Sequence, residues 1–251
     1  MSLLRPGLLV VRRDDRHLQI GIDPPWRLVV PDRPDVQRLL DDLVAGRVPA
    51  PQTPEAHRAL HALARAGMLT EAAAAGPAAP PAAVQVHGSG PLAAEAVRVL
   101  RAAGCAVADD GPVALLLTDG EPRRADVDGQ VREGRPHLVV AASALGYTVG
   151  PFVVPGATAC LRCVDAHLGE HDPRRAVVVE QLGGRPGGPD DPALRTLAAA
   201  WAARDVLTYL EGCRPTSWSA TLSLSAGLDP VRRDWARHPH CGCSWAQDLA
   251  G

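Results

Sequence analysis

The sequence predicts an α/β protein in two parts, a small α+β module followed by a larger α/β domain. Three observations lead to this prediction. Short apolar runs and then two helical runs fill residues 1–71, and a glycine-rich turn lies between a strand and a helix at residues 88–93. Two cysteine pairs, one near residue 160 and one near the C-terminus, can close the second part around a metal.

The composition fits a folded protein and excludes several functions. The chain has 251 residues, of which 46% are hydrophobic, enough for substantial cores. A net charge of -2 and an aromatic content of 3% offer neither a basic field nor a stacking surface, so we expect no nucleic-acid partner. We find neither a signal peptide nor an apolar run of about 18 to 20 residues, so we expect a cytoplasmic protein without a membrane span. The chain contains no lysine, which excludes any mechanism that needs one.

Residues 1–71 predict a winged-helix-like module. The predicted strands, each bounded by turn residues, are 8–13, 18–22 and 26–30. Apolar residues at helical spacing then predict two helices, one ending at Gly46 and one opened by Thr53-Pro54-Glu55 and ending at Gly67.

Because many winged helices bind DNA, a regulator is one interpretation of this module. The second helix carries a mixed and weakly basic set of side chains, namely Glu55, His57, Arg58, His61 and Arg65. A phosphate-contacting surface needs a more uniformly basic stripe, so this face argues against DNA binding.

An Ala/Pro tract over residues 72–83 separates the two parts. Gly76-Pro77 and Pro80-Pro81 would stop any helix entering from the preceding module. We therefore expect a semi-stiff linker, and a second domain over residues 84–251.

The second domain opens with a dinucleotide-fold fingerprint. A strand at 84–86 leads into Gly88-Ser89-Gly90-Pro91-Leu92-Ala93 and a helix ending at Gly104, and Asp109 and Asp110 supply the trailing acid. Only Asp109 to Pro112 precede the next strand, at 113–118, whereas a parallel crossover needs a dozen or more residues. The second crossover is therefore missing or collapsed, and we expect a truncated Rossmann-like fold with a degenerate nucleotide crevice.

The rest of the domain alternates strands, helices and one loop. The predicted elements are a helix at 121–132, strands at 137–141 and 147–154, a mobile polar loop at 172–191, a helix at 192–210 and a strand at 220–224.

The two cysteine pairs predict a structural zinc site. Cys160-Leu161-Arg162-Cys163 and Cys241-Gly242-Cys243 supply four thiolates, which close a tetrahedral shell and leave no open position for catalysis. The alternatives are buried thiols or disulfides, although a disulfide within Cys-Gly-Cys would be strained. His238 and His240 flank the second pair and offer a replacement for one thiolate.

The second domain resembles the ThiF family, which has the fold of ubiquitin-activating enzymes. The resemblance covers residues 83–244 and rests on the order of several segments: Gly88–Ala93, Thr118-Asp119, 135–154, Cys160-x-x-Cys163, the helix end Tyr209-Leu210-Glu211-Gly212, and 237–243. Residues 1–71 resemble a PqqD-type peptide-recognition element. The combination is similar to leader-peptide-binding, ThiF-like partner proteins of YcaO-type cyclodehydratases, which make thiazole/oxazole-modified peptides.

This resemblance implies a non-catalytic scaffold that binds the leader of a precursor peptide and presents it to a separate ATP-dependent enzyme. The leader is expected to add a strand beside residues 26–30. The implied contacts are Trp26, Arg27, Leu28, Val29 and Val30, with Arg58, His61 and Arg65 at the rim. The resemblance also leaves open a homodimer, which is typical of the ThiF fold.

A second interpretation is an ATP-dependent enzyme that adenylates a peptide. Asp119 matches the metal-binding aspartate of the ThiF family. The arginine-containing nucleotide motif has no counterpart in residues 109–112, and no cysteine lies between Val164 and Gly212 to act as a nucleophile. We therefore expect no catalytic residues and only a degenerate nucleotide site near Gly88, Gly90 and Asp119.

Overall fold

A computed structural model describes residues 2–71, 82–188 and 190–243. The chain divides into two compact units, Met1–Ala78 and Ala79–Gly251, and each is described by itself. Most of the predicted linker lies outside the described residues, but Ala83 already belongs to the first strand of the second unit.

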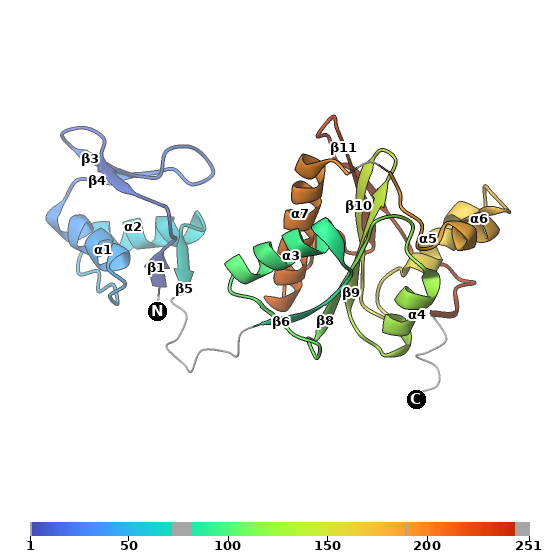
Figure 1. The fold of residues 1–251 in the computed structure, drawn as a ribbon. Helices are drawn as coiled ribbons and strands as arrows, with labels where there is room; N and C mark the ends of the chain where they lie inside the picture. Colours follow the sequence, from blue (N-terminus) through green and yellow to red (C-terminus); the bar gives the residue numbers. More distant parts are fainter. Residues whose placement is uncertain (1, 72–81, 189, 244–251) are drawn as a thin grey trace. The chain divides into compact units, whose positions relative to one another are not determined.

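The N-terminal unit contains a three-stranded antiparallel sheet of order β2-β3-β4, two helices, and a separate antiparallel pair, β1 and β5 (Figure 1). In chain order its elements are β1 Ser2–Leu4, β2 Val10–Arg12, β3 His17–Ile20, β4 Leu28–Pro31, α1 Pro34–Val44, α2 Pro54–Arg65 and β5 Leu69–Glu71. The three predicted strands and both helices are present, each slightly shorter than expected. The β1–β5 pair was not predicted.

The helices form where the sequence predicts them because each has one apolar face and a proline in its first turn. Thr53 caps α2 by accepting a hydrogen bond from the Ala56 amide at 3.2 Å. The buried face of α2 packs on β4, whose Val30 side chain shares the core with Leu63.

The second unit is built on a seven-stranded mixed sheet of order β12-β11-β10-β9-β8-β6-β7. Its strands are β6 Ala83–His87, β7 Ala106–Val107, β8 Val113–Thr118, β9 His137–Ser143, β10 Gly146–Val153, β11 Ala220–Ser225 and β12 Val231–Asp234. Its helices are α3 Gly90–Ala102, α4 Arg124–Arg132, α5 Leu161–Gly169, α6 Arg175–Leu182 and α7 Pro192–Leu210. Strands β6 to β9 pair in parallel and the remaining pairs are antiparallel.

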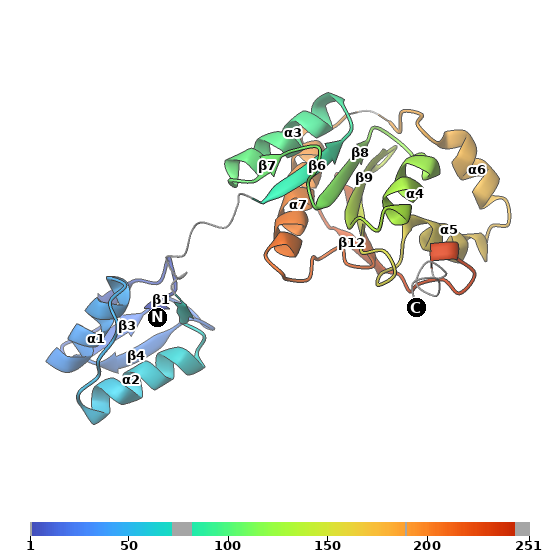
Figure 2. The ribbon, with the colours of Figure 1, turned by 90° about the horizontal axis from the view of Figure 1, so that it is seen from below.

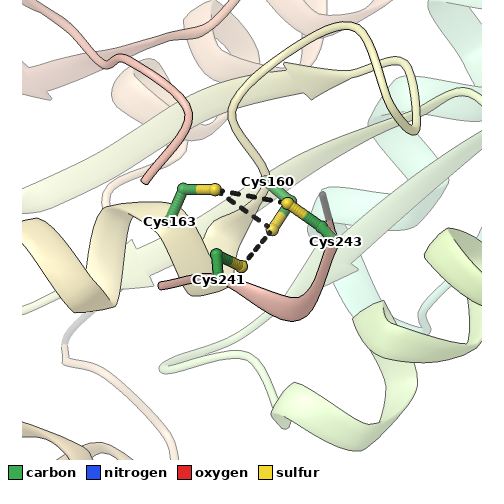
Figure 3. Close-up of side chains that lie close together, drawn as sticks. All are labelled: Cys160, Cys163, Cys241 and Cys243. Atoms are coloured by element: carbon green, nitrogen blue, oxygen red, sulfur yellow. Dashed lines mark hydrogen bonds between the residues drawn. The ribbon is translucent and has the colours of Figure 1, made fainter. Parts of the chain in front are cut away.

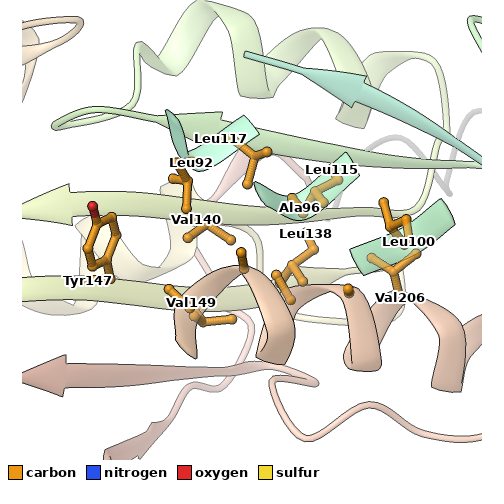
Figure 4. Packing of buried hydrophobic residues seen from close by; sticks show 14 of the residues in the cluster. Leu92, Ala96, Leu100, Leu115, Leu117, Leu138, Val140, Tyr147, Val149 and Val206 are labelled. Atoms are coloured by element: carbon orange, nitrogen blue, oxygen red, sulfur yellow. The ribbon is translucent and has the colours of Figure 1, made fainter. Parts of the chain in front are cut away.

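Helices cover both faces of this sheet (Figure 2). On one face, α3 and α7 bury Leu115, Leu138 and Val140, and Figure 4 shows these side chains packed against both helices. On the other face, Val139 and Leu116 pack beneath α4 and α5. No helix in the described parts of the chain is long and apolar enough to cross a membrane.

The prediction of a mobile polar loop over residues 172–191 was wrong, because α6 forms inside it. Arg175 at its first turn pairs with Asp165 of α5 at 3.3 Å, and Val179 is buried. The run Ala176-Val177-Val178-Val179 has no helical periodicity, so the helix depends on these tertiary contacts rather than on a local pattern.

Candidate functional site

The four predicted zinc ligands come together in the second unit. Their sulfur atoms lie at 3.7 Å for Cys160 and Cys163, 3.6 Å for Cys160 and Cys241, and 3.4 Å for Cys163 and Cys243 (Figure 3). A tetrahedral zinc ion with Zn–S bonds of about 2.3 Å has sulfur atoms roughly 3.8 Å apart. The cluster therefore fits a four-thiolate ion closely, and all four thiols are free rather than paired in disulfides.

The fold positions the cluster by fixing both chain segments. Cys160 is the N-cap of α5 and Cys163 lies in its first turn, so the pair sits at a helix start rather than in a loop. The returning segment is anchored first by buried Trp235, whose amide donates to the Ser219 carbonyl at 2.8 Å and whose indole donates to Thr221 at 2.9 Å.

The thiols interact strongly with one another. The pKa of Cys163 is lowered, mainly because the Cys160 thiol donates a hydrogen bond to it, with a further contribution from the His238 backbone N–H. The pKa of Cys160 is raised by the same bond and by burial. Buried thiolates cannot accumulate without a compensating charge, and a divalent cation supplies that charge.

His238, which precedes the second cysteine pair, makes its hydrogen bonds outside the cysteine cluster. His238 Nε2 lies 3.0 Å from Glu170 Oε1, and its Nδ1 accepts from the His240 amide at 3.2 Å. His167 of α5 reaches the Ala236 carbonyl at 3.0 Å. These bonds hold the tail against α5, and the four cysteines remain the ligand set that the geometry favours.

Among the residues that the structure describes, β4 pairs with β3 alone, so its other edge is free. The Asp32 amide donates to the Arg16 carbonyl of the neighbouring chain segment at 2.7 Å. Leu18 lies opposite Val30, and Gln19 lies opposite Val29. Because hydrogen-bonded and non-hydrogen-bonded pairs alternate along an antiparallel ladder, the N–H and C=O groups of Val30 point toward β3 and those of Val29 point outward. Pro31 also lies on the outward side and has no N–H to offer.

The predicted peptide contacts are not equivalent. Val29 is 39% exposed and Trp26 is 43% exposed, although Trp26 and Arg27 precede β4 rather than belonging to it. Arg5 lies over the Trp26 ring at 5.1 Å. Val30 is 3% exposed and belongs to the core, so its side chain offers nothing to a partner.

The predicted rim residues of α2 all lie on its exposed side. At 100° per residue, Arg58, His61 and Arg65 occupy an arc of roughly 60°, opposite the buried Ala56 and Leu63. Arg58 is also paired with Glu55 at 2.6 Å. Their positions suit long-range charge attraction better than close contact beside β4.

The glycine turn has the backbone of a dinucleotide fold. Gly88 adopts φ +137, and a side chain there would collide with the Leu117 carbonyl of β8. Gly90 adopts φ +82 and begins α3, where Ala93 is buried as close packing requires.

The crossover after β7 is short. β7 pairs only with Ala83 and Val84 at the start of β6, and the Ala108 amide donates to the Val84 carbonyl. Asp109 therefore follows a strand that pairs only with the start of β6, whereas the glycine turn lies at the other end of β6. Gly111 then passes against the backbone of β6, where a side chain would not fit.

A second segment covers the carboxyl ends of the central strands. The Gly184 and Gly187 amides donate to the carbonyls of Glu121 and Asp119, and Gly120 is bridged to Pro186. The Asp119 carboxylate faces the start of α3, because Oδ2 would lie only 3.5 Å from a side-chain carbon at Gly90. Asp119 therefore lies beside the glycine turn, where the ThiF resemblance predicts it.

No family model matches this sequence, and no curated protein matches it. Solved structures do match. The heterocyclase TruD superposes with a TM-score of 0.72 at 19% identity, covering 97% of this chain and 42% of TruD. A heterocyclase in complex with substrate and cofactor gives 0.71 at 17%, covering 97% and 39%. Escherichia coli MccB with MccA gives 0.67 at 12%, covering 97% and 99%.

The chain has the fold of these proteins. At these identities the likeness establishes the mixed α/β architecture and its seven-stranded sheet, in agreement with the predicted α/β class. The chain spans less than half the length of either heterocyclase and nearly the whole length of MccB.

Proposed function

We propose that the chain is a non-catalytic leader-peptide-binding scaffold, which presents a ribosomal precursor peptide to a separate, ATP-dependent cyclodehydratase of the YcaO type. In this proposal residues 1–71 recognise the leader, residues 72–83 are the linker, and residues 84–251 form a ThiF-like domain closed by a structural zinc ion. The observation that carries the proposal is the free edge of β4.

An extended peptide can add to this edge as a fourth strand. The outward N–H and C=O of Val29 would provide main-chain hydrogen bonds, and the exposed Val29 and Trp26 side chains would provide apolar contacts. α2 packs on the same strand and forms a wall beside it. Pro31 ends the ladder on the outward side, so pairing is centred on Val29.

The structural neighbours support a role in peptide modification. TruD is a heterocyclase, and MccB is a microcin C7 biosynthetic enzyme solved in complex with N-formylated MccA. This chain matches 42% of TruD, and in our proposal the cyclising activity belongs to the separate cyclodehydratase.

The test is to titrate a fluorescent leader peptide, taken from the precursor encoded nearest to this gene, into the full chain and into Val29→Pro. Proline removes the outward N–H, so we expect affinity to fall about tenfold or more. Val29→Thr keeps the N–H and branched shape and should bind within about threefold. Val10→Pro places the same ring on the opposite edge of the sheet, at β2, and should also leave binding unchanged. Equal affinity in Val29→Pro would reject the proposed site.

The alternative function is ATP-dependent peptide adenylation, because the same fold covers MccB solved with ATP. The short crossover and the position of Asp109 disfavour it. We expect no pyrophosphate release from this chain with ATP, magnesium and peptide. Peptide-dependent release that disappears in Asp119→Ala would establish the alternative.

A further inference from the structure

Arg5 connects the start of β4 with the end of α2. Its guanidinium lies over the Trp26 ring, 5.1 Å from the ring centroid, and its Nε donates to the Gly67 carbonyl at 3.1 Å. Its backbone amide donates to the Met68 carbonyl at 2.8 Å. Trp26 lies just before β4, and Gly67 lies just after α2. These contacts therefore lie at one end of the free edge of β4.

The positive charge of Arg5 is available to a partner. The residue is exposed, and among the described side chains its two outer nitrogens, Nη1 and Nη2, have neither a hydrogen bond nor an ion pair. The contact with Trp26 and the Nε bond restrict the side chain, so little further conformational entropy is lost when a partner binds. An arginine held in this way can still donate two parallel N–H groups to a carboxylate.

The two ends of β4 differ in what they offer. At the start, the Trp26 ring is 43% exposed although Arg5 lies over it, and tryptophan and arginine are the residue types that contribute most to binding at interfaces. At the other end, β4 finishes at Pro31, and the nearby Asp35 carboxylate already accepts a hydrogen bond from the Thr53 hydroxyl. An acidic side chain of a paired strand is therefore favoured only at the Trp26 end.

The alternation of side chains along β4 defines which leader residues would meet Arg5. Val30 and Leu28 pack on the core beneath α2, whereas Val29 is exposed on the opposite face. The Trp26 ring lies on the α2 side as well, because Arg5 joins it to the end of that helix. Residues opposite Val30, Leu28 and Trp26 are spaced two apart and share one face of an added strand. On that face the leader would place apolar side chains first and a carboxylate last.

We propose that Arg5 and Trp26 select a leader that carries an aspartate or glutamate two residues away from an apolar residue on the same strand face. The carboxylate binds the outer nitrogens of Arg5, and the neighbouring chain packs on the Trp26 ring. This inference rests on the proposed leader binding at β4 and adds to it the chemistry of the sequence that is recognised.

The experiment is a double-mutant cycle in the full chain, with a fluorescent leader peptide taken from the precursor encoded nearest to this gene. Each aspartate and glutamate of the leader is replaced in turn by asparagine or glutamine. We expect Arg5→Gln to weaken binding about tenfold, and one leader substitution to weaken binding to the native chain by the same factor. That substitution should change affinity by less than about twofold in Arg5→Gln.

Arg13→Gln is the matched control. Arg13 follows β2, the strand farthest from the free edge of β4, and also makes one side-chain hydrogen bond, to Gln19. Its replacement should leave leader affinity within about twofold, since an exposed charge away from the contact is screened by solvent and salt. Arg5→Lys keeps the charge but not the planar fork, so it should recover only part of the affinity that Arg5→Gln loses.

The outcomes separate this inference from the proposed function. Weaker binding in Val29→Pro with unchanged affinity in Arg5→Gln would overturn the role of Arg5 and leave leader binding at β4 intact. Unchanged affinity in Val29→Pro would reject the proposed site and this inference with it. If every leader substitution had the same effect on the native chain and on Arg5→Gln, Arg5 would not contact a carboxylate and the inference would be wrong.

Discussion

The two outer strands β4 and β12 differ in the charged side chains that they carry along their free edges. Within the described ranges each pairs with one neighbour only, β4 with β3 and β12 with β11. β12 reads Val231-Arg232-Arg233-Asp234, is exposed along its whole length, and places Arg232 against Asp234. β4 reads Leu28-Val29-Val30-Pro31 and carries no charge.

This difference separates a protected edge from an available one. Unpaired strands attract other chains, and proteins commonly prevent this with charged side chains. β12 has three charges in four residues, whereas only Pro31 limits pairing along β4. An uncharged edge with outward backbone groups at Val29 is what a strand-adding peptide requires.

The largest expected effect comes from removing one zinc ligand. The loss of stability should be confined to the second unit, which contains β12, and should spare the first unit, which contains β4. Cys241→Ser should reduce zinc from one ion per chain to nearly none, and lower the melting temperature of the second unit by more than about 10 °C, since structural zinc is linked to folding by roughly 10 to 16 kcal/mol in small domains. Elemental analysis and calorimetry measure both quantities.

The control for this variant is Cys213→Ser, which alters an exposed thiol outside the cluster and should change neither zinc nor melting temperature. Leader binding at β4 should survive in both variants. Metal-free protein of unchanged stability would contradict a structural zinc site.

Acid should also distinguish the two units. Burial lowers the pKa of His137 in β9 to about 4, so the folded state resists protonation that the unfolded state accepts near pH 6.5. The stability that depends on neutral His137 is complete above pH 6.5 and is lost as the pH falls toward 4, by about 3 kcal/mol in total. Urea unfolding between pH 7.5 and 5 measures this slope.

The comparison variant is His137→Gln, which should have a shallower slope than the native chain whatever its stability at pH 7. Residues 2–71 contain no buried histidine, so the first unit should lack this dependence. Parallel slopes for the native chain and His137→Gln would show that another group is responsible.

Exchanging the character of the edges should produce a smaller effect. Val29→Lys gives β4 a charge like those of β12 and should weaken leader binding about fivefold to tenfold without lowering the melting temperature. The converse pair, Arg232→Val with Arg233→Val, should promote self-association of the chain, measured by light scattering. Unchanged leader affinity in Val29→Lys would show that the absence of charge along β4 does not matter for peptide binding.

The smallest effect is expected at the α2 rim. Because Arg58, His61 and Arg65 are exposed and Arg58 is already paired with Glu55, replacing any one of them by alanine should change leader affinity by less than about threefold, and only at low salt. A tenfold loss at one of them would mean direct contact with the peptide.

Much of the fold could be predicted from local patterns. The helix Pro192–Leu210 and the strand Val113–Thr118 have the predicted bounds, because a long apolar period and a short continuous apolar run need no tertiary information. The cysteine cluster was predicted for a similar reason, since four thiols at these spacings have few other uses. The contacts that form α6 and the β1–β5 pair join segments that are far apart in the sequence, so no local pattern predicts them.

The site was predicted less completely. The sequence led us to propose residues 26–30 as the strand that pairs with a peptide, but only the pairing register shows that the backbone groups of Val29 point outward, and only the structure shows that the side chain of Val30 belongs to the core. The glycine fingerprint correctly marked a strand–turn–helix unit and placed Asp119 near Gly90, but nothing in the sequence predicted that residues 184–188 would bond to the backbone of residues 119–121.

The most direct measurement of the central claim is amide hydrogen exchange by NMR on the full chain, with and without the leader peptide. We predict that the Val29 amide becomes protected when peptide binds, while the inward amide of Val30 and the amides of β12 exchange as before. Protection at β12 with none at Val29 would contradict the account.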